Sequence, residues 1–282
     1  MQAFGLEETN QYEAAEAAGR AAVSACPRDA WAIHAVAHVM EMSGRTDDGI
    51  LWLQLRTDDW ARDCFFQVHN WWHLALYLFD QQRYNEVIGL YDSRIAAGSG
   101  MLDMVDASAL LWRLTLHDVD VGDRWQTLAS RWEARIGDAW YGFNDTHAMM
   151  AFVGAGRFDL ANRLLTTMQE TAAGVVENAS ITKTVSLPVA RALMAYGKRE
   201  FAESVRLLAP IRSVLWHGGG SHAQRDALLQ TLIRAAERGG EQSAARALLS
   251  ERIQLKPASP FNRLWLQRAN GAAIAAPQSA NP

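Results

Sequence analysis

A short signal that ends a helix recurs along this chain at nearly regular intervals. Apolar helical segments end at Gly44-Arg45, Gln82-Arg83, Leu116-His117-Asp118 (a degenerate form), Gly156-Arg157, Lys198-Arg199 and Gly239-Gly240. After each signal comes a short polar stretch and a second amphipathic helix. The interval is roughly 36 to 43 residues, which is typical of stacked helix–turn–helix repeats. An array of paired helices is therefore the architecture that the sequence predicts.

The expected fold class is all-α, a right-handed superhelix of stacked tetratricopeptide-like hairpins. Low proline content and the lack of alternating β-branched runs support it. We expect the first helix of each hairpin, the A helix, to start near Ala30, Phe65, Asp103, Asn144, Lys183 and Ser221. Each hairpin packs on its neighbours, so residues 1–270 are expected to form a single domain. Residues 271–282 are rich in Ala, Pro, Ser and Asn, which predicts a flexible tail.

The beginning of the chain reads as part of a hairpin. Ala3–Glu8 looks like the tail of an A helix, and Tyr12–Ala25 looks like the B helix that follows it. By its sequence the first repeat is therefore expected to lack its beginning, with no earlier hairpin to cover Phe4 and Leu6. We expect this apolar face to be exposed or covered by a second chain, which leaves a homo-oligomer open.

The A helices carry most of the polar chemistry. Because A helices of such arrays line the concave face, their polar side chains are expected to meet in one ligand-binding groove. The residues concerned are His34, His38, Glu41, His69, Asn70, His73, Asp103, Asp106, Asn144, Asp145, His147, Ser221, His222 and Arg225.

Two pairs of histidines stand out within this set. His34 and His38 are four residues apart, as are His69 and His73, so each pair leaves one face of its helix. His-x-x-x-His is the spacing of two metal ligands, which makes these four residues metal-ligand candidates. Two other interpretations stay open: a site for a non-metal ligand or acid–base chemistry, and structural pairing through hydrogen bonds between helices.

The glycine loop before Ser221 predicts a capped helix. Ser221 is a natural N-cap, and Gln224 completes a Ser-x-x-Gln capping box. The free N–H groups and Arg225 suit an anion, although a flexible turn between repeats with its own cap is the favoured interpretation. A Ser221-His222-Asp226 triad is rejected, because adjacent Ser221 and His222 are poorly placed for proton transfer.

Composition excludes several classes of partner. The net charge is −4 and no Lys/Arg cluster exists, which argues against nucleic acid. No apolar run approaches the roughly 18 residues of a membrane span, and no secretory signal opens the chain. Cys26 and Cys64 lack metal or redox spacing, which fits a reducing cytoplasm.

Several long segments resemble the family of proteins similar to tetratricopeptide repeat protein 38. They are AWAIHAVAHVMEMSGR (30–45), VHNWWHLALYLFD (68–80), LDMVDASALLWRL (102–114), FNDTHAMMAFVGAGR (143–157) and GGSHAQRD (219–226). Members of that family are generally longer at the N-terminus, so this chain is a short or truncated member by this resemblance. The resemblance implies an α-helical repeat fold and says little about activity.

Three functions from different classes remain at this point. The first is a repeat protein whose His/Asp-lined groove binds a peptide, a partner protein or another ligand, by analogy with the architecture. The second is a small-molecule enzyme that uses the His/Asp cluster for acid–base or metal-dependent chemistry, and the third is a structural or oligomeric scaffold. A partner groove should be open, whereas a small-molecule site should be enclosed. The sequence names neither a cofactor nor a reaction.

Overall fold

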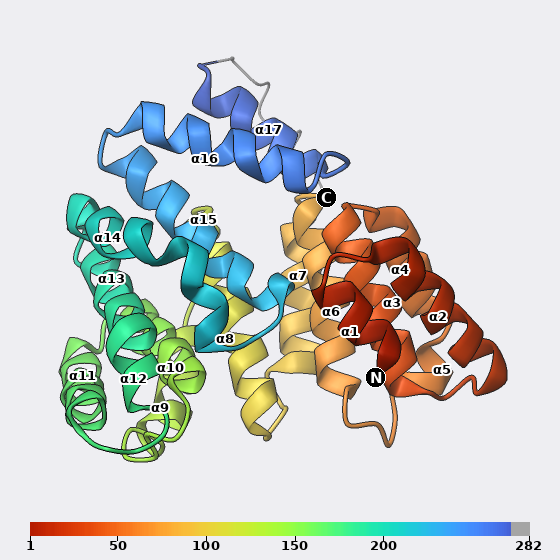
Figure 1. Ribbon diagram of the computed structural model, residues 1–282, viewed down its shortest axis with the longest axis horizontal. Helices are drawn as coiled ribbons and strands as arrows, with labels where there is room; N and C mark the ends of the chain where they lie inside the picture. The colour runs from red at the N-terminus through yellow and green to blue at the C-terminus, as the bar shows by residue number, and fades with distance from the viewer. Residues whose placement is uncertain (272–282) are drawn as a thin grey trace.

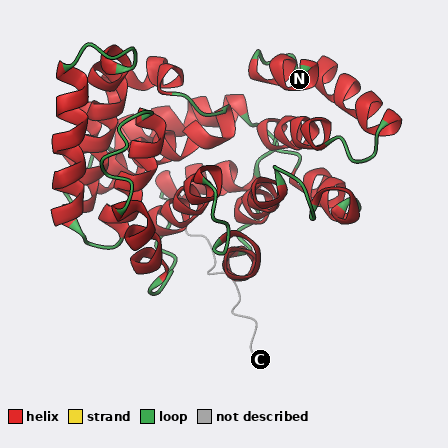
Figure 2. Ribbon diagram, turned by 90° about the horizontal axis from the view of Figure 1, so that it is seen from below, coloured by secondary structure: helices red, strands yellow, loops and turns green. Residues whose placement is uncertain are grey.

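The structure is a computed structural model, and residues 1–271 of it are described below. Within that range all regular elements are helices, joined by turns and loops without a strand (Figures 1 and 2). The all-α class is thus confirmed for this range. None of the described helices is long and apolar enough to cross a membrane. The tail expected over 271–282 lies, apart from Gly271, outside the described residues.

Most helices pair as antiparallel hairpins along the chain. The A helices are α1 (Gln2–Glu8), α3 (Ala30–Ser43), α6 (Gln67–Asp80), α8 (Met101–Leu116), α10 (Gly142–Gly154), α13 (Leu187–Gly197) and α15 (His222–Arg238). The helices that follow them are α2 (Tyr12–Ala25), α4 (Thr46–Gln54), α7 (Tyr84–Leu90), α9 (Arg124–Glu133), α11 (Phe158–Ala173), α14 (Phe201–Leu208) and α16 (Gln242–Leu255). Short helices α5 (Thr57–Trp60) and α12 (Ala179–Ile181) lie in connections, and α17 (Pro260–Ala269) ends the described chain.

One backbone turn ends every A helix and explains the repeated sequence signal. The residues with positive φ in these turns are Asn10, Gly44, Gln82, Asp118, Gly156, Arg199 and Gly240. The next N–H then reaches back five residues, for example from Arg45 to the Met40 carbonyl at 2.9 Å. This is the Schellman geometry, in which a left-handed residue satisfies the last carbonyls of a helix. The expected punctuation is therefore a structural feature, and Asn10 shows that α1 ends as an A helix does.

The expected A-helix starts are right to within a few residues. Four of them shift by two residues or more: α6 begins at Gln67, α8 at Met101, α10 at Gly142, and the helix predicted near Lys183 begins earlier, at Ala179. In the last case the reason is continuous helical backbone, because α12 runs through a π-helical turn at Thr182–Ser186 into α13.

The last A helix, α15, lies against the A helices of earlier repeats (Figure 1). Trp112 on α8 donates from Nε1 to Thr231 Oγ1 on α15 at 2.8 Å, and the buried Arg113 donates to the Ala223 carbonyl. Beyond α15, Lys256 pairs with Glu41 on α3 at 2.7 Å. The polar faces of the first repeats are thus covered from within the chain and do not form an open trough.

Helix α1 also packs inward, against expectation. The Phe4 ring stacks on His34, with centroids 5.5 Å apart, and meets His38 edge-on at 5.2 Å. Phe4 and Leu6 are half-buried, so the apolar face expected to be exposed or covered by a second chain is covered in part by its own chain. The reason is the direction of packing, because α1 lies on α3 of the following repeat.

Candidate functional site

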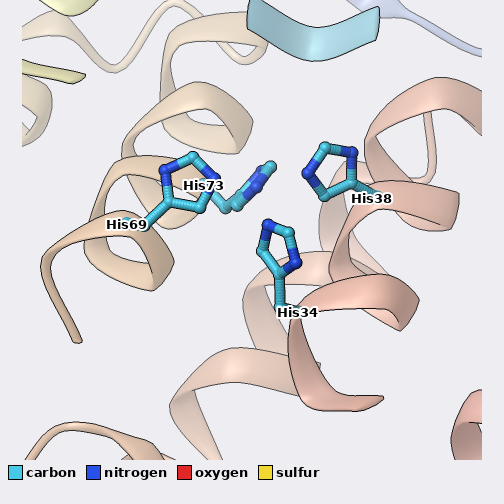
Figure 3. A group of neighbouring side chains, drawn as sticks. All are labelled: His34, His38, His69 and His73. Carbon is cyan, nitrogen blue, oxygen red and sulfur yellow. The ribbon is translucent and has the colours of Figure 1, made fainter. Parts of the chain in front are cut away.

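Four histidines from two neighbouring A helices converge at the centre of the first repeats (Figure 3). His34 and His38 come from α3, and His69 and His73 come from α6. Each offers one ring nitrogen, and these four atoms all lie within 4.8 Å of one another. The sequence prediction that the two His-x-x-x-His pairs face each other is confirmed.

The cluster is enclosed by apolar and aromatic side chains. His38 and His73 have no exposed surface, and the other two are nearly as buried. Phe66 stacks on His34 with centroids 4.4 Å apart and rings almost parallel, and Trp72 stacks on His69 at 5.1 Å. Phe4 closes the side toward α1. These rings fix the orientation of the imidazoles and keep bulk water away.

Three of these four imidazoles make no hydrogen bond within the described residues. Both ring nitrogens of His34, His38 and His73 lack a hydrogen-bond partner among the described residues. Burial first, and then the neighbouring imidazoles, hold the pKa values of these three histidines well below the ordinary range. The rings are therefore neutral at physiological pH, with lone pairs available for a ligand.

A carboxylate stands behind the cluster at His69. Asp106 on α8 is fully buried, and its Oδ2 lies 2.7 Å from His69 Nδ1. Burial raises the pKa of Asp106, while the contact with His69 acts in the opposite direction. With Nδ1 engaged in this way, His69 keeps Nε2 for the cluster, an arrangement common for metal-ligating histidines.

A second carboxylate approaches His38. Glu7 on α1 has no exposed surface, its Oε2 lies 3.5 Å from His38 Nδ1, and neither of its oxygens has a hydrogen-bond partner within the described range. Burial, followed by the charge and contact of Glu8, raises the pKa of Glu7 to about 8. A group of this kind is costly to bury and suggests a functional reason for its presence.

The four-histidine geometry fits a transition-metal ion. Zinc bound at about 2.1 Å in a tetrahedron places its ligand nitrogens about 3.4 Å apart. The four nitrogens lie within 4.8 Å of one another, so binding an ion would draw them closer through ring rotations and small helix shifts. Imidazole suits zinc, copper, iron and nickel, and metal binding requires the neutral ring. The four nitrogen donors, their neutral form and the carboxylate next to His69 are thus all consistent with a site for such an ion.

The expected anion position at the start of α15 is filled from within the chain. Glu8 Oε1 accepts from the His222 backbone N–H at 3.1 Å, and Oε2 lies 3.2 Å from His222 Nδ1 and 3.4 Å from Arg225 Nη2. The Glu8 carboxylate therefore takes the place predicted for a free anion. Helix dipole, free N–H and guanidinium act on it together.

The predicted capping box of α15 is confirmed. Ser221 Oγ accepts from the Gln224 N–H at 3.3 Å, and Gln224 Oε1 accepts from the Ser221 N–H at 3.0 Å. We expect Ser221→Ala to lower the free energy of unfolding by about 1 kcal/mol, as for a lost N-cap. Urea unfolding measures it, with Ser250→Ala on the exposed face of α16 as the control. Equal stability of the two variants would contradict this role of Ser221.

A cavity of about 840 Å³ begins at Glu8 and extends between η3 (Ala209–Gly218), α15 and α16. Its polar and charged lining residues are Glu8, Arg212, Ser213, His222, Arg225, Asp226, Glu251 and Arg252. The rest of its wall is apolar and includes Met42, Leu208, Leu215, Leu228, Leu229 and Leu232. The Glu7–Glu8 pair therefore lies between the histidine cluster and this cavity.

Several predicted site residues lie elsewhere or serve local structure. Glu41 pairs with Lys256, and Asp103 Oδ2 accepts from the Gly100 N–H at 2.8 Å, which caps α8. Asn144 is half-buried in the first turn of α10. His147 is buried with Nδ1 2.7 Å from the Phe143 carbonyl, and burial lowers its pKa to about 4. None of these joins the four-histidine group.

Two further polar residues of the A helices are buried: Asn70, next to His69 on α6, and Asp145, next to Asn144 on α10. Asn70 has no exposed surface, and neither atom of its amide has a hydrogen-bond partner in the described part of the chain. Burial, followed by the charge of Asp138, raises the pKa of Asp145 to about 7.

Sequence reasoning missed the acidic pair on α1 and one ion pair. Glu7 and Glu8 lie on a helix that was recognised as an A helix, so the rule that A-helix polar residues meet would have included them. Asp226 and Arg252 form a buried two-point ion pair between α15 and α16. Burial alone would raise the pKa of Asp226, but Arg252 holds it well below its usual range. The sequence carries no local signal for this long-range pair.

Comparison with known proteins adds no further assignment. No family model matches the chain, and no solved structure matches it.

Proposed function

We propose that this protein is a metal-binding helical-repeat protein, with one divalent transition-metal ion, zinc first among the candidates, held by His34, His38, His69 and His73. The observation that carries the proposal is the convergence of four buried ring nitrogens within 4.8 Å of one another. Four protein ligands in an enclosed position are typical of a metal site that stabilises a fold. The ion would link α3 to α6.

Structural pairing without a ligand explains the cluster less well. Buried polar groups in proteins are nearly always hydrogen-bonded, because an unsatisfied group costs roughly 1–3 kcal/mol. Here, within residues 1–271, three histidines leave both ring nitrogens unpaired in one small volume. A metal ion would satisfy these nitrogens together. Asp106 then acts as the outer partner that orients His69, as carboxylates do in many metal sites.

The proposal includes the arrangement of the hairpins around this site. The repeated left-handed turns support a superhelix of tetratricopeptide-like hairpins, and they agree with the resemblance to the tetratricopeptide repeat protein 38-like family. Enclosure by α1 and α15 favours a small ligand over a peptide in the concave groove. The free cysteines Cys26 and Cys64 are in keeping with a reducing compartment such as the cytoplasm.

Metal analysis of the purified protein tests the proposal. After expression without an affinity tag that binds metals, we expect zinc or a neighbouring transition metal to remain through gel filtration, as measured by inductively coupled plasma mass spectrometry. A strong chelator should then lower the melting temperature, because an ion present at about 1,000 times its Kd contributes about 4 kcal/mol. Protein that neither retains metal nor gains thermal stability from any added divalent ion would refute the proposed function.

A further inference from the structure

We propose that Glu7, Glu8 and His38 hold a second metal ion beside the four-histidine centre, with His38 giving up its ring N–H proton to solvent and bridging the two ions as an imidazolate through its two nitrogens. Each of the three residues offers one ligand atom, and these atoms lie within 4.8 Å of one another. The inference rests on the proposed function through His38, which belongs to both groups. The two carboxylates balance the charge of one divalent ion, and the imidazolate offsets part of the charge of the other.

The distance between Glu7 and His38 favours an ion between them. Glu7 Oε2 and His38 Nδ1 are 3.5 Å apart, beyond the usual 2.7–3.2 Å of a hydrogen bond. Two ligands of a tetrahedral zinc ion, at bond lengths of 2.0–2.1 Å, are about 3.3–3.4 Å apart. The direct imidazole–carboxylate contact in the same cluster, between His69 and Asp106, is much shorter at 2.7 Å. The two carboxylates therefore play different roles.

The burial of Glu7 also favours an ion next to its carboxylate. Its side chain has no exposed surface, and no residue in the described range hydrogen-bonds either carboxylate oxygen. In its anionic form a carboxylate buried in this way is stable only when it is paired or coordinates a metal. Glu8 contacts His222 and Arg225 at 3.1–3.4 Å, and a carboxylate has further lone pairs with which to reach an ion.

The position of Glu8 gives the second ion a different environment from the first. Glu8 lines the cavity of about 840 Å³, whereas the four histidines are enclosed. Three protein ligands leave a coordination position for water or another oxygen donor. The apolar walls of the cavity suit a small molecule with an apolar body whose carbonyl or carboxylate oxygen reaches this ion.

Zinc stoichiometry tests the inference, with Asp106→Asn as a matched control for Glu7→Gln. Both changes neutralise one buried carboxylate next to a cluster histidine. Each protein is loaded with excess zinc, passed through gel filtration and analysed for zinc per chain. We expect two ions for the parent, two for Asp106→Asn and one for Glu7→Gln. Glu8→Gln, also expected to hold one, serves if Glu7→Gln does not fold.

The outcomes separate the two proposals. If Glu7 only orients His38, the parent binds one ion, and Glu7→Gln and Asp106→Asn behave alike, each with weaker binding of that ion. This result overturns the second site and leaves the proposed function intact. A parent that binds no zinc overturns both. Copper(II) loading gives a second readout, because two copper ions bridged by one imidazolate couple magnetically and lose electron paramagnetic resonance intensity.

Discussion

Replacing His73 with alanine is expected to abolish retention of the ion at the four-histidine centre. The change removes one of four ligands, so the loss should exceed the roughly 10–100-fold that follows when an outer-shell partner is replaced. The metal-free variant should lose only about 1–3 kcal/mol, the usual range for one substitution in a core, because His73 has no hydrogen bond within residues 1–271 to lose. Bound metal and the melting temperature, each measured with and without zinc, test both parts.

His147→Ala is the matched control for this prediction. His147 is another buried histidine on an A helix, but its ring is bonded to the Phe143 carbonyl and lies outside the four-histidine group. It should keep the parent's metal content and the parent's rise in melting temperature with zinc. If His73→Ala keeps as much metal as His147→Ala, the four-histidine centre is not the metal site. If His73→Ala is much less stable than the parent when both are free of metal, His73 has a structural role instead.

The helical array was predictable because its signals are local. A left-handed residue such as Gly44 ends each A helix, and the apolar period on either side defines the two helices of a hairpin. The facing of the histidine pairs was predictable for a related reason. Equal four-residue spacing in successive repeats sets both pairs at a similar height once neighbouring A helices pack side by side.

The acidic half of the site depends on contacts that no local pattern encodes. Glu8 meets the start of α15 across 214 residues, which requires the array to bring its last A helix against its first. Two other predicted residues are engaged in contacts outside the site, one local and one long-range. Asp103 caps the helix on which it lies, and Glu41 pairs with Lys256 from the end of the chain. Residue type predicted membership of the site where the packing of neighbouring helices decided the contact. It failed where a helix cap or a distant ion pair decided it.

Glu7→Gln is expected to stabilise the metal-free protein, increasingly so as the pH rises. The pKa of Glu7 is raised from 4.5 to about 8 in the folded chain. Between these values the folded state binds the proton more tightly than the unfolded state, so this group lowers stability by about 1.4 kcal/mol per pH unit as pH increases. The pKa difference, about 8 minus 4.5, sets an upper limit of about 5 kcal/mol, reached near pH 8.

Urea unfolding in the presence of a chelator, at several pH values from 5 to 9, measures this effect. The stability of Glu7→Gln relative to the parent should rise up to about pH 8 and then level off. Glu13→Gln, which removes an exposed carboxylate from α2, should follow the parent throughout. A difference between Glu7→Gln and the parent that does not change with pH would show that Glu7 is not held in a costly environment. A pH-dependent gain in the variant, together with its loss of an ion, would mean that the chain keeps Glu7 for a ligand at the expense of stability.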